Sequence, residues 1–378
     1  MVNGYDVIVV GLGAMGSATL HQLAHRGHRV LGLEQFTPAH ALGSSHGKSR
    51  IIREAYFEDP RYVPLVQRAY ECWHELEKES GVTVFRQTGG LMLGAPDSAV
   101  VSGALLSAQL HNLPHEVIGA DEVQRRYPAF RPRPSDIGVV EPRAGMLAPE
   151  RAITAFTTLA KQHGADVHSD EPMLSWRAVG DGVEVTTAKG TYSATRLVLT
   201  VGAWAGKVLR ELGVPFQAQR NVVYWFTPAR NAHYFTPEKF PVFLQELGPG
   251  LTSYGFADTG DGVKFALHHF GESVDPDTVR RTVGDDEIAV VRSLLAEWMP
   301  DANGALREAG VCMYTNVPDE HFVIDVHPDH PAVIVASPCS GHGFKFSSAL
   351  GEVLADMATN LPVGFDTSLF SLARFSQR

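Results

Sequence analysis

The chain has 378 residues, 42 of them acidic and 32 basic, so its formal net charge is −10 with histidine neutral. Apolar residues make up 44% of the chain, enough for a sizeable core, which excludes global disorder, and the length predicts two domains or one large interleaved domain. The acidic balance argues against nucleic acid or an anionic membrane as a partner, and the sequence holds no run of about 18 apolar residues that would predict a transmembrane helix.

The cysteines and the start of the chain predict a cytoplasmic location. Cys72, Cys312 and Cys339 are too few for a disulfide framework, which favours a reducing compartment. A strand pattern begins at Tyr5, so we expect no secretory signal. A small, odd number of cysteines also leaves one of them free for a chemical role.

The predicted elements change character along the chain. Continuous apolar runs at 5–10 and 332–337 are typical of parallel strands buried on both faces, whereas the middle of the chain alternates as antiparallel strands do. We interpret residues 243–251 as a loop. In chain order we predict a strand at 5–10, a helix at 14–26, a strand at 29–33, a helix at 62–80, a strand at 88–94, a helix at 149–163, strands at 183–185, 192–199, 221–226 and 263–270, a helix at 285–298, strands at 309–314 and 332–337, and a helix at 344–359.

This order predicts an α/β fold in which a Rossmann-type domain, assembled from both ends of the chain, is interleaved with a mixed, largely antiparallel sheet on the substrate side. We assign residues 1–82, 146–212 and 322–378 to the first domain. Residues 83–145 and 213–321 form the second, substrate-binding domain. The boundaries follow the changes from alternating strands and helices to strands alone.

A glycine motif joins the first predicted strand to the first predicted helix. The motif is Gly11-x-Gly13-x-x-Gly16, and its glycines permit a tight turn and a close approach of backbone N–H groups to a pyrophosphate at the helix N-terminus. Glu34 ends the next strand, where a carboxylate accepts from ribose hydroxyls and disfavours a 2′-phosphate. The unit predicts a bound dinucleotide, either FAD or NAD.

The strand at 263–268 predicts one charged and one apolar face. Lys264 and His268 are four residues apart and share a face, while Val263, Phe265 and Leu267 share the other, which we expect to be core. The charged pair suits either a solvated sheet face or an electrostatic site above a cofactor.

Two further residue pairs have side chains that suit a catalytic or binding role. Arg50 and Arg53 lie close to the dinucleotide unit, and a planar guanidinium suits a carboxylate, although two solvated arginines on a loop are equally consistent. Cys312 and Tyr314 are two apart in a strand and point the same way. A cysteine thiolate is a good nucleophile, and Cys339 is a rival for that role.

Three segments, together with the glycine motif, resemble the family of monomeric sarcosine oxidase and N-methyltryptophan oxidase. The resemblance runs over nearly the whole chain and implies a glutathione-reductase-like FAD domain with covalently held FAD. It also implies oxidation of the C–N bond of a secondary amino acid, with electrons passed to O₂ to give H₂O₂. The segments are Ser44-Ser45-His46-Gly47-Lys48-Ser49-Arg50-Ile51-Ile52-Arg53, Cys312-Met313-Tyr314-Thr315-Asn316-Val317-Pro318-Asp319-Glu320-His321-Phe322 and Ser340-Gly341-His342-Gly343-Phe344-Lys345-Phe346-Ser347-Ser348.

The resemblance implies roles for individual residues. Cys312 would carry the 8α-S-cysteinyl bond to the flavin, and Arg53 and Lys345 would bind the substrate carboxylate. Lys264 would promote the reaction of reduced flavin with O₂, because negative charge develops on oxygen in that step. The other expected catalytic residues are Arg50, His46, Tyr254, Tyr314 and His268; the expected cofactor contacts are Gly11, Gly13, Gly16, Glu34, Ser44, Arg50, Gly341, Gly343 and Lys345, and no metal ion is expected.

The chain departs from the family pattern at several positions. The family usually has Asp where this chain has Lys48 and Thr where it has Ser49, so the charge balance near the flavin differs. Cys339 has no matching cysteine in the family, and we interpret it as an inert substitution. Leu244 and Gln245 stand near where the family shapes its substrate pocket.

The expected function is oxidation of sarcosine with O₂ and water to glycine, formaldehyde and H₂O₂, by hydride transfer to the flavin and reoxidation by O₂. The alternatives are a larger or cyclic substrate (N-methyltryptophan, pipecolate or proline) and a dehydrogenase with another electron acceptor, against which Lys264 argues. A catalytically silent flavoprotein is disfavoured by the retained Arg53, Cys312 and Lys345. We expect a monomer whose partners are a small secondary amine and O₂.

Overall fold

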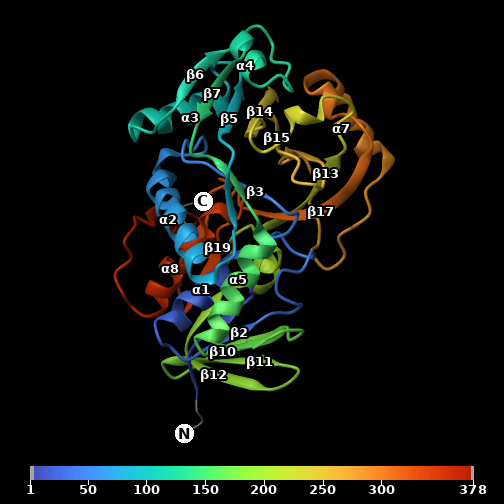
Figure 1. Ribbon diagram of the computed structural model, residues 1–378. Helices are drawn as coiled ribbons and strands as arrows, with labels where there is room; N and C mark the ends of the chain where they lie inside the picture. Colours follow the sequence, from blue (N-terminus) through green and yellow to red (C-terminus); the bar gives the residue numbers. More distant parts are fainter. Residues whose placement is uncertain (1–3, 376–378) are drawn as a thin grey trace.

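The computed structural model describes residues 4–375, which form two sheet-centred parts stacked end to end (Figure 1). The first sheet has, within these residues, eight strands in the order β10-β11-β12-β1-β2-β9, with β19 beside β12 and β18 beside β19. Its strands are β1 (Tyr5–Val10), β2 (Val30–Leu33), β9 (Asp166–His168), β10 (Met173–Val179), β11 (Gly182–Thr187), β12 (Thr191–Leu199), β18 (Val323–His327) and β19 (His330–Ser337).

The centre of this sheet is parallel and covered on both faces. Strand β1 runs parallel to β2 and β12, and β12 runs parallel to β19. Val7 and Val9 of β1 face one hydrophobic core, and Ile8 and Val10 face another, so all four side chains are buried. This explains why β1 is a continuous apolar run rather than an alternating one.

Helices cover one face of the first sheet. They are α1 (Ala14–His25), α2 (Val63–Ser80), α5 (Pro149–Gln162) and α8 (Ser347–Ala358), and Figure 1 shows them grouped together. The helix predicted at 62–80 is confirmed as α2, and its apolar residues are buried in this core; they include Leu65, Val66, Ala69, Trp73 and Leu76. Helix α8 is preceded by a 3-10 turn, η6, and the short helix α6 follows β12; their bounds are Phe344–Phe346 and Ala205–Val208.

The second sheet has the order β17-β13-β16-β15-β14-β5-β7-β6 within the described residues, and all its pairings are antiparallel except that of β14 with β5. Phe226 and Phe265 pack against Val291 and Leu295 of α7 (Asp285–Trp298), whose ends are as predicted. The other elements are β5 (Gly90–Gly94), β6 (Glu116–Gly119), β7 (Ile137–Glu141), β13 (Gln217–Phe226), β14 (Val242–Gly248), β15 (Leu251–Phe256), β16 (Val263–His268), β17 (Leu306–Asn316), α3 (Ala99–Leu110) and α4 (Ala120–Arg126).

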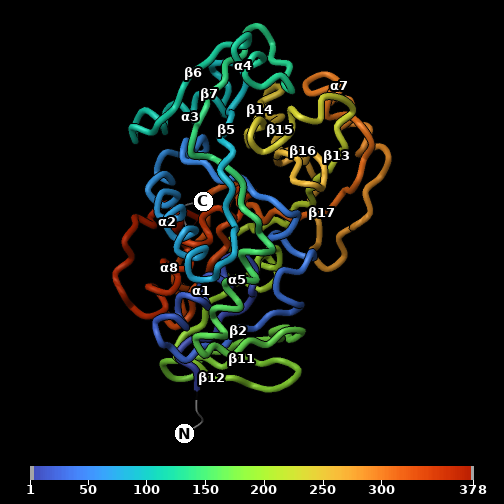
Figure 2. The backbone as a smooth tube through the Cα atoms, in the orientation of Figure 1, coloured from blue at the N-terminus to red at the C-terminus, as the bar shows by residue number. Residues whose placement is uncertain are grey.

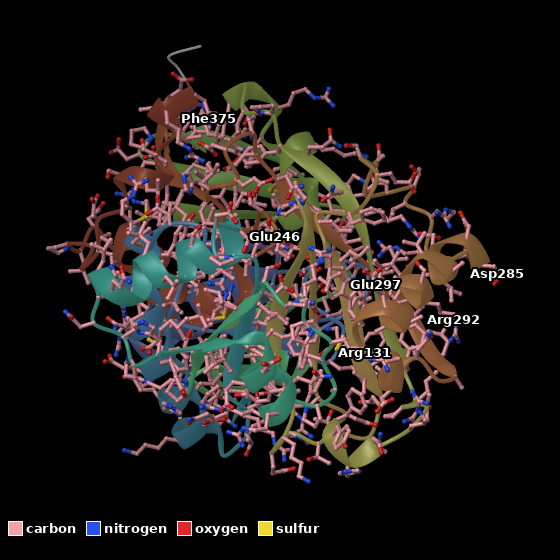
Figure 3. All side chains as sticks on the ribbon, turned by 90° about the horizontal axis from the view of Figure 1, so that it is seen from above. Arg131, Glu246, Asp285, Arg292, Glu297 and Phe375 are labelled. Atoms are coloured by element: carbon pink, nitrogen blue, oxygen red, sulfur yellow. The ribbon has the colours of Figure 1, made fainter. Side chains whose placement is uncertain are left out.

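The outer side of α7 faces solvent. Asp285 and Glu297 are exposed there, and Figure 3 shows Asp285 and Arg292 at the edge of the molecule. A short third sheet lies between the two parts of the chain. It consists of β3 (Arg50–Ile52), β8 (Gly145–Leu147) and β4 (Phe85–Gln87), paired in the order β3-β8-β4. Figure 2 shows the chain passing back and forth between the two parts.

The predicted fold class is confirmed, with one correction in the second sheet. Residues 243–251, interpreted as a loop, lie mostly in β14, which pairs with β15 through a tight turn near Gly250. Phe243, Leu244 and Gln245 are buried on both sides of that strand, so the sequence lacks the alternation that marks an exposed strand. The assignment of sequence segments to two domains stays a prediction. Among the helices of residues 4–375, none is both long and apolar enough to cross a membrane.

Candidate active site

The glycine motif forms the turn between β1 and α1. A Cβ on Gly11, whose φ is +88°, would lie 2.5 Å from the carbonyl oxygen of Thr200, and a Cβ on Gly16 would overlap the carbonyl oxygen of Gly11. A Cβ on Gly13 would meet only the Oγ of Ser45, at 3.6 Å. Packing therefore requires glycine at the first and third positions, whereas the second leaves the backbone open, as a bound pyrophosphate needs.

Glu34 ties this turn to the end of β2. Its Oε2 accepts from the N–H of Leu12 at 2.7 Å, and its Oε1 accepts from the N–H of Phe36 at 3.0 Å. The carboxylate is buried but lines a cavity that continues from the glycine turn, so its remaining lone pairs face that cavity. This is where a carboxylate binds ribose hydroxyls.

The cavity brings most of the expected site residues together. Its wall also carries Ser44 and Ser337, whose buried Oγ atoms have no hydrogen-bond partner among the described residues. Open glycine backbone, an acidic side chain and unpartnered hydroxyls suit a long polar cofactor, so the residues fit a dinucleotide. The predicted residues that line the cavity are Gly11, Gly13, Glu34, Ser44, Arg50, Arg53, Tyr254, His268, Tyr314, Gly341, Gly343 and Lys345, whereas Gly16, His46, Lys264 and Cys312 lie behind its wall.

Arg50 of β3 lies against the sulfur of Cys312. Its Nη2 donates to the carbonyl oxygen of Ser44 at 2.8 Å and is 3.4 Å from the Sγ of Cys312, and its Nη1 donates to the carbonyl oxygen of Ser49 at 2.9 Å. The Sγ of Cys312 is also 3.4 Å from the carbonyl oxygen of Ser44. A buried guanidinium stabilises negative charge on a neighbouring sulfur.

The other two cysteines have different surroundings. Cys72 is buried in the core beneath α2. Cys339 is partly buried and lines the cavity, and its Sγ accepts from the N–H of Thr315 at 3.2 Å. Burial raises the pKa of the Cys339 thiol, which makes the thiolate harder to form.

Arg53 is held by a carboxylate that the sequence analysis missed. Its Nη2 donates to the Oε2 of Glu58 at 2.5 Å and its Nη1 to the carbonyl oxygen of Ala55 at 2.8 Å. The guanidinium also lies over the rings of Tyr56 and Phe57. Burial by itself would raise the pKa of Glu58, but the neighbouring Arg53, His342 and Lys345 together outweigh it and hold that pKa at about 2. Both members of this pair line the cavity.

Lys345 lies beside Arg53 in a buried network. Its Nζ donates to the carbonyl oxygen of His342 at 2.6 Å and to the Oη of Tyr56 at 3.3 Å. The Nε2 of His342 donates to the carbonyl oxygen of Glu320 at 3.0 Å, so its Nδ1 accepts from Tyr56 at 2.6 Å. Burial, followed by the charge of Arg53, lowers the pKa of Lys345 to about 7.

Lys264 is fully buried, with 1% of its surface exposed. Its Nζ donates to the carbonyl oxygens of Gly47 and Ser49 at 2.6 and 2.9 Å and contacts the Oγ of Ser49 at 3.3 Å. It also lies over the rings of Trp225 and Phe256. The alternative of a solvated sheet face is therefore wrong, because β16 is covered on both sides. Burial lowers the pKa of Lys264 well below its usual value.

Three side chains, from β15, β16 and β17, form a polar row on the cavity wall. The Nδ1 of His268 is 3.3 Å from the Oη of Tyr314, which is 3.5 Å from the Oη of Tyr254. Burial lowers the pKa of His268 well below its usual value, so its imidazole is neutral. Gly341, with a φ of +78°, packs against this row, and a Cβ there would lie 2.7 Å from the ring of Tyr314.

The segment 44–50 is held from both sides. The Oε1 of Glu150, on α5, accepts from the N–H groups of Gly47 and Lys48 at 2.7 and 3.0 Å, and Lys264 binds the same segment from β16. His46 is buried there with its Nε2 unpartnered among the described residues, and burial lowers its pKa to about 4.

The Lys48 side chain turns away from the cavity. Its Nζ pairs with Asp261 at 3.0 Å and with Glu308 at 2.6 Å, so two carboxylates offset its charge. Ser49, the other departure from the family pattern, supplies two of the acceptors of Lys264. Leu244 lines the cavity, whereas Gln245 is buried with its amide unpartnered within the described part of the chain.

The glycine turn, the buried acid at the end of β2 and the shared cavity define a dinucleotide-dependent oxidoreductase. The model of the FAD dependent oxidoreductase family matches residues 6–357, and the chain belongs to this family. The predicted family and the predicted flavin-dependent oxidoreductase are thereby confirmed.

Three curated relatives are similar to this chain over nearly its whole length. The chain is 46% identical to the monomeric sarcosine oxidase of Streptomyces avermitilis, covering 98% of both chains. It is 43% identical to the monomeric sarcosine oxidase of Bacillus sp. strain NS-129, covering 99% of this chain and 98% of the other. It is 36% identical to the N-methyl-L-tryptophan oxidase of Yersinia pestis, covering 98% and 99%.

Two solved structures share the fold. NikD, an unusual amino acid oxidase essential for nikkomycin biosynthesis, is 25% identical, with a TM-score of 0.85 and 97% of each chain covered. L-proline dehydrogenase from P. horikoshii is 21% identical, with a TM-score of 0.86, covering 100% of this chain and 99% of the other.

Proposed function

We propose that the protein oxidises the N-methyl group of sarcosine, with O₂ and water as co-substrates and glycine, formaldehyde and H₂O₂ as products. The observation that carries this proposal is the pair of cations, Arg53 and Lys345, buried side by side on the wall of the cofactor cavity. Two donors there suit the carboxylate of a small amino acid. The 46% identity to a monomeric sarcosine oxidase supports the same substrate and a monomer.

We propose separate roles for the residues that bind the cofactor and those that bind the substrate. The glycine turn and Glu34 would hold the dinucleotide part of FAD, Ser44 would contact it, and Cys312 would form the covalent link. When bound, FAD accepts a hydride from the substrate and passes the electrons to O₂. Arg53 and Lys345 bind the carboxylate and so orient the amine. The neutral His268 does not repel the amine, because its burial disfavours the imidazolium.

Lys264 is proposed to act on O₂. Its three acceptors hold the ammonium group in one place, and the surrounding segment excludes water. When protonated, an amine fixed in this way stabilises negative charge that develops on oxygen and needs no reorganisation to do so, and that negative charge in turn favours the protonated form that burial disfavours. We also propose that residues 1–82, 146–212 and 322–378 form the FAD-binding domain, and that residues 83–145 and 213–321 form the substrate-binding domain.

N-methyltryptophan is the second candidate substrate, because a relative that carries this substrate in its name is 36% identical over 98% of the chain. The two are separated by measuring H₂O₂ formation by the purified yellow protein with sarcosine, N-methyltryptophan, pipecolate, proline and the carboxylate-free dimethylamine. We expect sarcosine to be the best substrate and dimethylamine a poor one. Equal rates with sarcosine and dimethylamine would remove the role of Arg53 and Lys345.

The covalent link is tested with two cysteine variants. Acid precipitation of the unaltered protein should leave the yellow colour in the pellet. The Cys312→Ala variant should release its flavin or purify without it, and the matched Cys339→Ala variant should retain it. The opposite pattern would move the attachment to Cys339, which lines the cavity, whereas Cys312 does not.

A further inference from the structure

Four potential metal ligands from three helices converge outside the cofactor cavity. His21 and His25 are four residues apart on one face of α1, Glu79 lies near the end of α2, and His163 directly follows α5. One ligand atom from each of these side chains lies within 4.8 Å of every other. None of the four lines the cofactor cavity, and the proposed oxidation uses none of them.

The separations match those of ligands around one ion. The Oε2 of Glu79 is 3.2 Å from the Nε2 of His21, and its Oε1 is 3.5 Å from the Nδ1 of His25 and 2.8 Å from the Nε2 of His163. The two exposed imidazoles are 3.3 Å apart, nitrogen to nitrogen. A tetrahedral Zn²⁺ ion with bonds of about 2.0–2.1 Å separates its ligand atoms by about 3.3 Å.

The burial of these residues also suits a metal. His21 is buried, and neither of its ring nitrogens has a partner in hydrogen-bond geometry within residues 4–375. The side chain of His25 is 55% exposed, which leaves a path for an ion from solvent. The Nε2 of His21 lies 3.2 Å from the Oε2 of Glu79 but outside hydrogen-bond geometry, so a metal on this nitrogen would supply the bond that the buried imidazole lacks.

A second cluster of potential metal ligands differs from this one in how its charge is balanced. Cys72, Glu75 and Glu352 also lie close together. There the guanidinium of Arg68 pairs with both glutamates, at 3.0 and 2.5 Å, so a cation of the protein already balances their charge. In the histidine cluster, Glu79 meets only imidazoles among the side chains that contact it in the described structure.

We propose that His21, His25, His163 and Glu79 bind one divalent transition-metal ion, with Zn²⁺ as the first choice. Imidazole nitrogens and a carboxylate oxygen are ligands that Zn²⁺ prefers, and four protein ligands make a closed structural site rather than a catalytic one. The ion joins α1, α2 and α5, which lie side by side in Figure 1. Helix α1 begins at the glycine turn, so the ion stabilises the helices around the cofactor-binding turn.

The test titrates ZnCl₂ into the flavin-loaded protein, made without a histidine tag and stripped with a chelator, in a calorimeter. We expect one Zn²⁺ per chain with a Kd of about 1 µM or below, and a rise in Tm with added Zn²⁺. His25→Ala and His163→Ala should each weaken binding by about tenfold or more, reduce the rise in Tm at a given Zn²⁺ concentration and leave sarcosine oxidation unchanged. Each of these side chains is partly exposed, so both variants should fold.

His74→Ala is the matched control, because His74 is an exposed histidine on α2 that contacts Glu77 and lies outside the cluster. This variant should bind Zn²⁺ as the unaltered protein does. The proposal is overturned if the unaltered protein binds no Zn²⁺, or if His25→Ala and His163→Ala bind it as tightly as the unaltered protein. An equal loss in His74→Ala would also overturn it, because binding would then not depend on the cluster.

Discussion

Arg53, which we propose as a binding group for the substrate carboxylate, is already paired with Glu58. A substrate carboxylate must therefore displace Glu58 from Arg53 or share the guanidinium with it. Glu58→Gln keeps the shape of the side chain and removes its charge. We expect this variant to bind carboxylates more tightly, because the neutral amide competes less well for Arg53.

The size of the effect follows from the charge state of Glu58. Its pKa is about 2 where 4.5 is usual, which corresponds to a net stabilisation of the carboxylate by about 3 kcal/mol. Burial opposes this shift and Arg53, His342 and Lys345 together cause it, so the net value does not give the contact with Arg53 by itself. A single charge-assisted contact is worth about 1.5–3 kcal/mol, which predicts a fall in Kd of roughly tenfold to a hundredfold.

Acetate is a suitable probe because it has a carboxylate and no amine to oxidise. Its Kd is measured at pH 6.5 from the change in the visible absorption of the bound flavin. Glu54→Gln is the control, because Glu54 is buried nearby, pairs with Arg143 and does not line the cavity. Weaker or unchanged binding of acetate by Glu58→Gln would refute the reasoning and show that Glu58 orients Arg53 rather than competing for it.

Two further predictions concern the buried lysines. The pKa of Lys345 is about 7 without substrate, and a bound carboxylate raises it, so the Kd for acetate should increase by up to about tenfold per pH unit above pH 7. The Kd of Lys345→Met for acetate should depend less on pH. A constant Kd for acetate from pH 7 to 9 in the unaltered protein would contradict the proposed role of Lys345. In Lys264→Met, anaerobic reduction by sarcosine should slow modestly, whereas reoxidation by O₂ should fall by about 10²–10³-fold. Equal losses in the two steps, measured by stopped flow, would make Lys264 a general structural residue.

Local sequence patterns predicted most of the elements around the site. The apolar run at 5–10 and the glycine motif gave the first βαβ unit, and apolar periodicity gave α7 within the bounds that the structure has. Such patterns depend on residues a few positions apart, which the sequence displays directly. The resemblance of the segments around Arg53 and Cys312 then indicated which side chains to examine in the cavity.

The features that escaped prediction depend on contacts between distant or irregular segments. Glu58 follows Arg53 in a stretch without regular structure, so no periodicity places the two side chains together. The alternation in β16 left open whether its Lys264 face meets solvent or a cofactor, and the structure shows that the segment 44–50 covers it. The role of Lys264, His268 and the other site residues stays a proposal until the variants are measured.

The contact between Cys312 and the segment 44–50 has a consequence for biosynthesis. The Sγ of Cys312 and the carbonyl oxygen of Ser44 lie 3.4 Å apart, although 268 positions separate these residues in the chain. During translation the first βαβ unit is made early, whereas Cys312 is made only after most of the second sheet. The ribosome therefore releases the cofactor-binding turn long before the cysteine reaches it. If Cys312 forms the proposed covalent link, a flavin that binds early must be held by noncovalent contacts alone until the chain is almost complete.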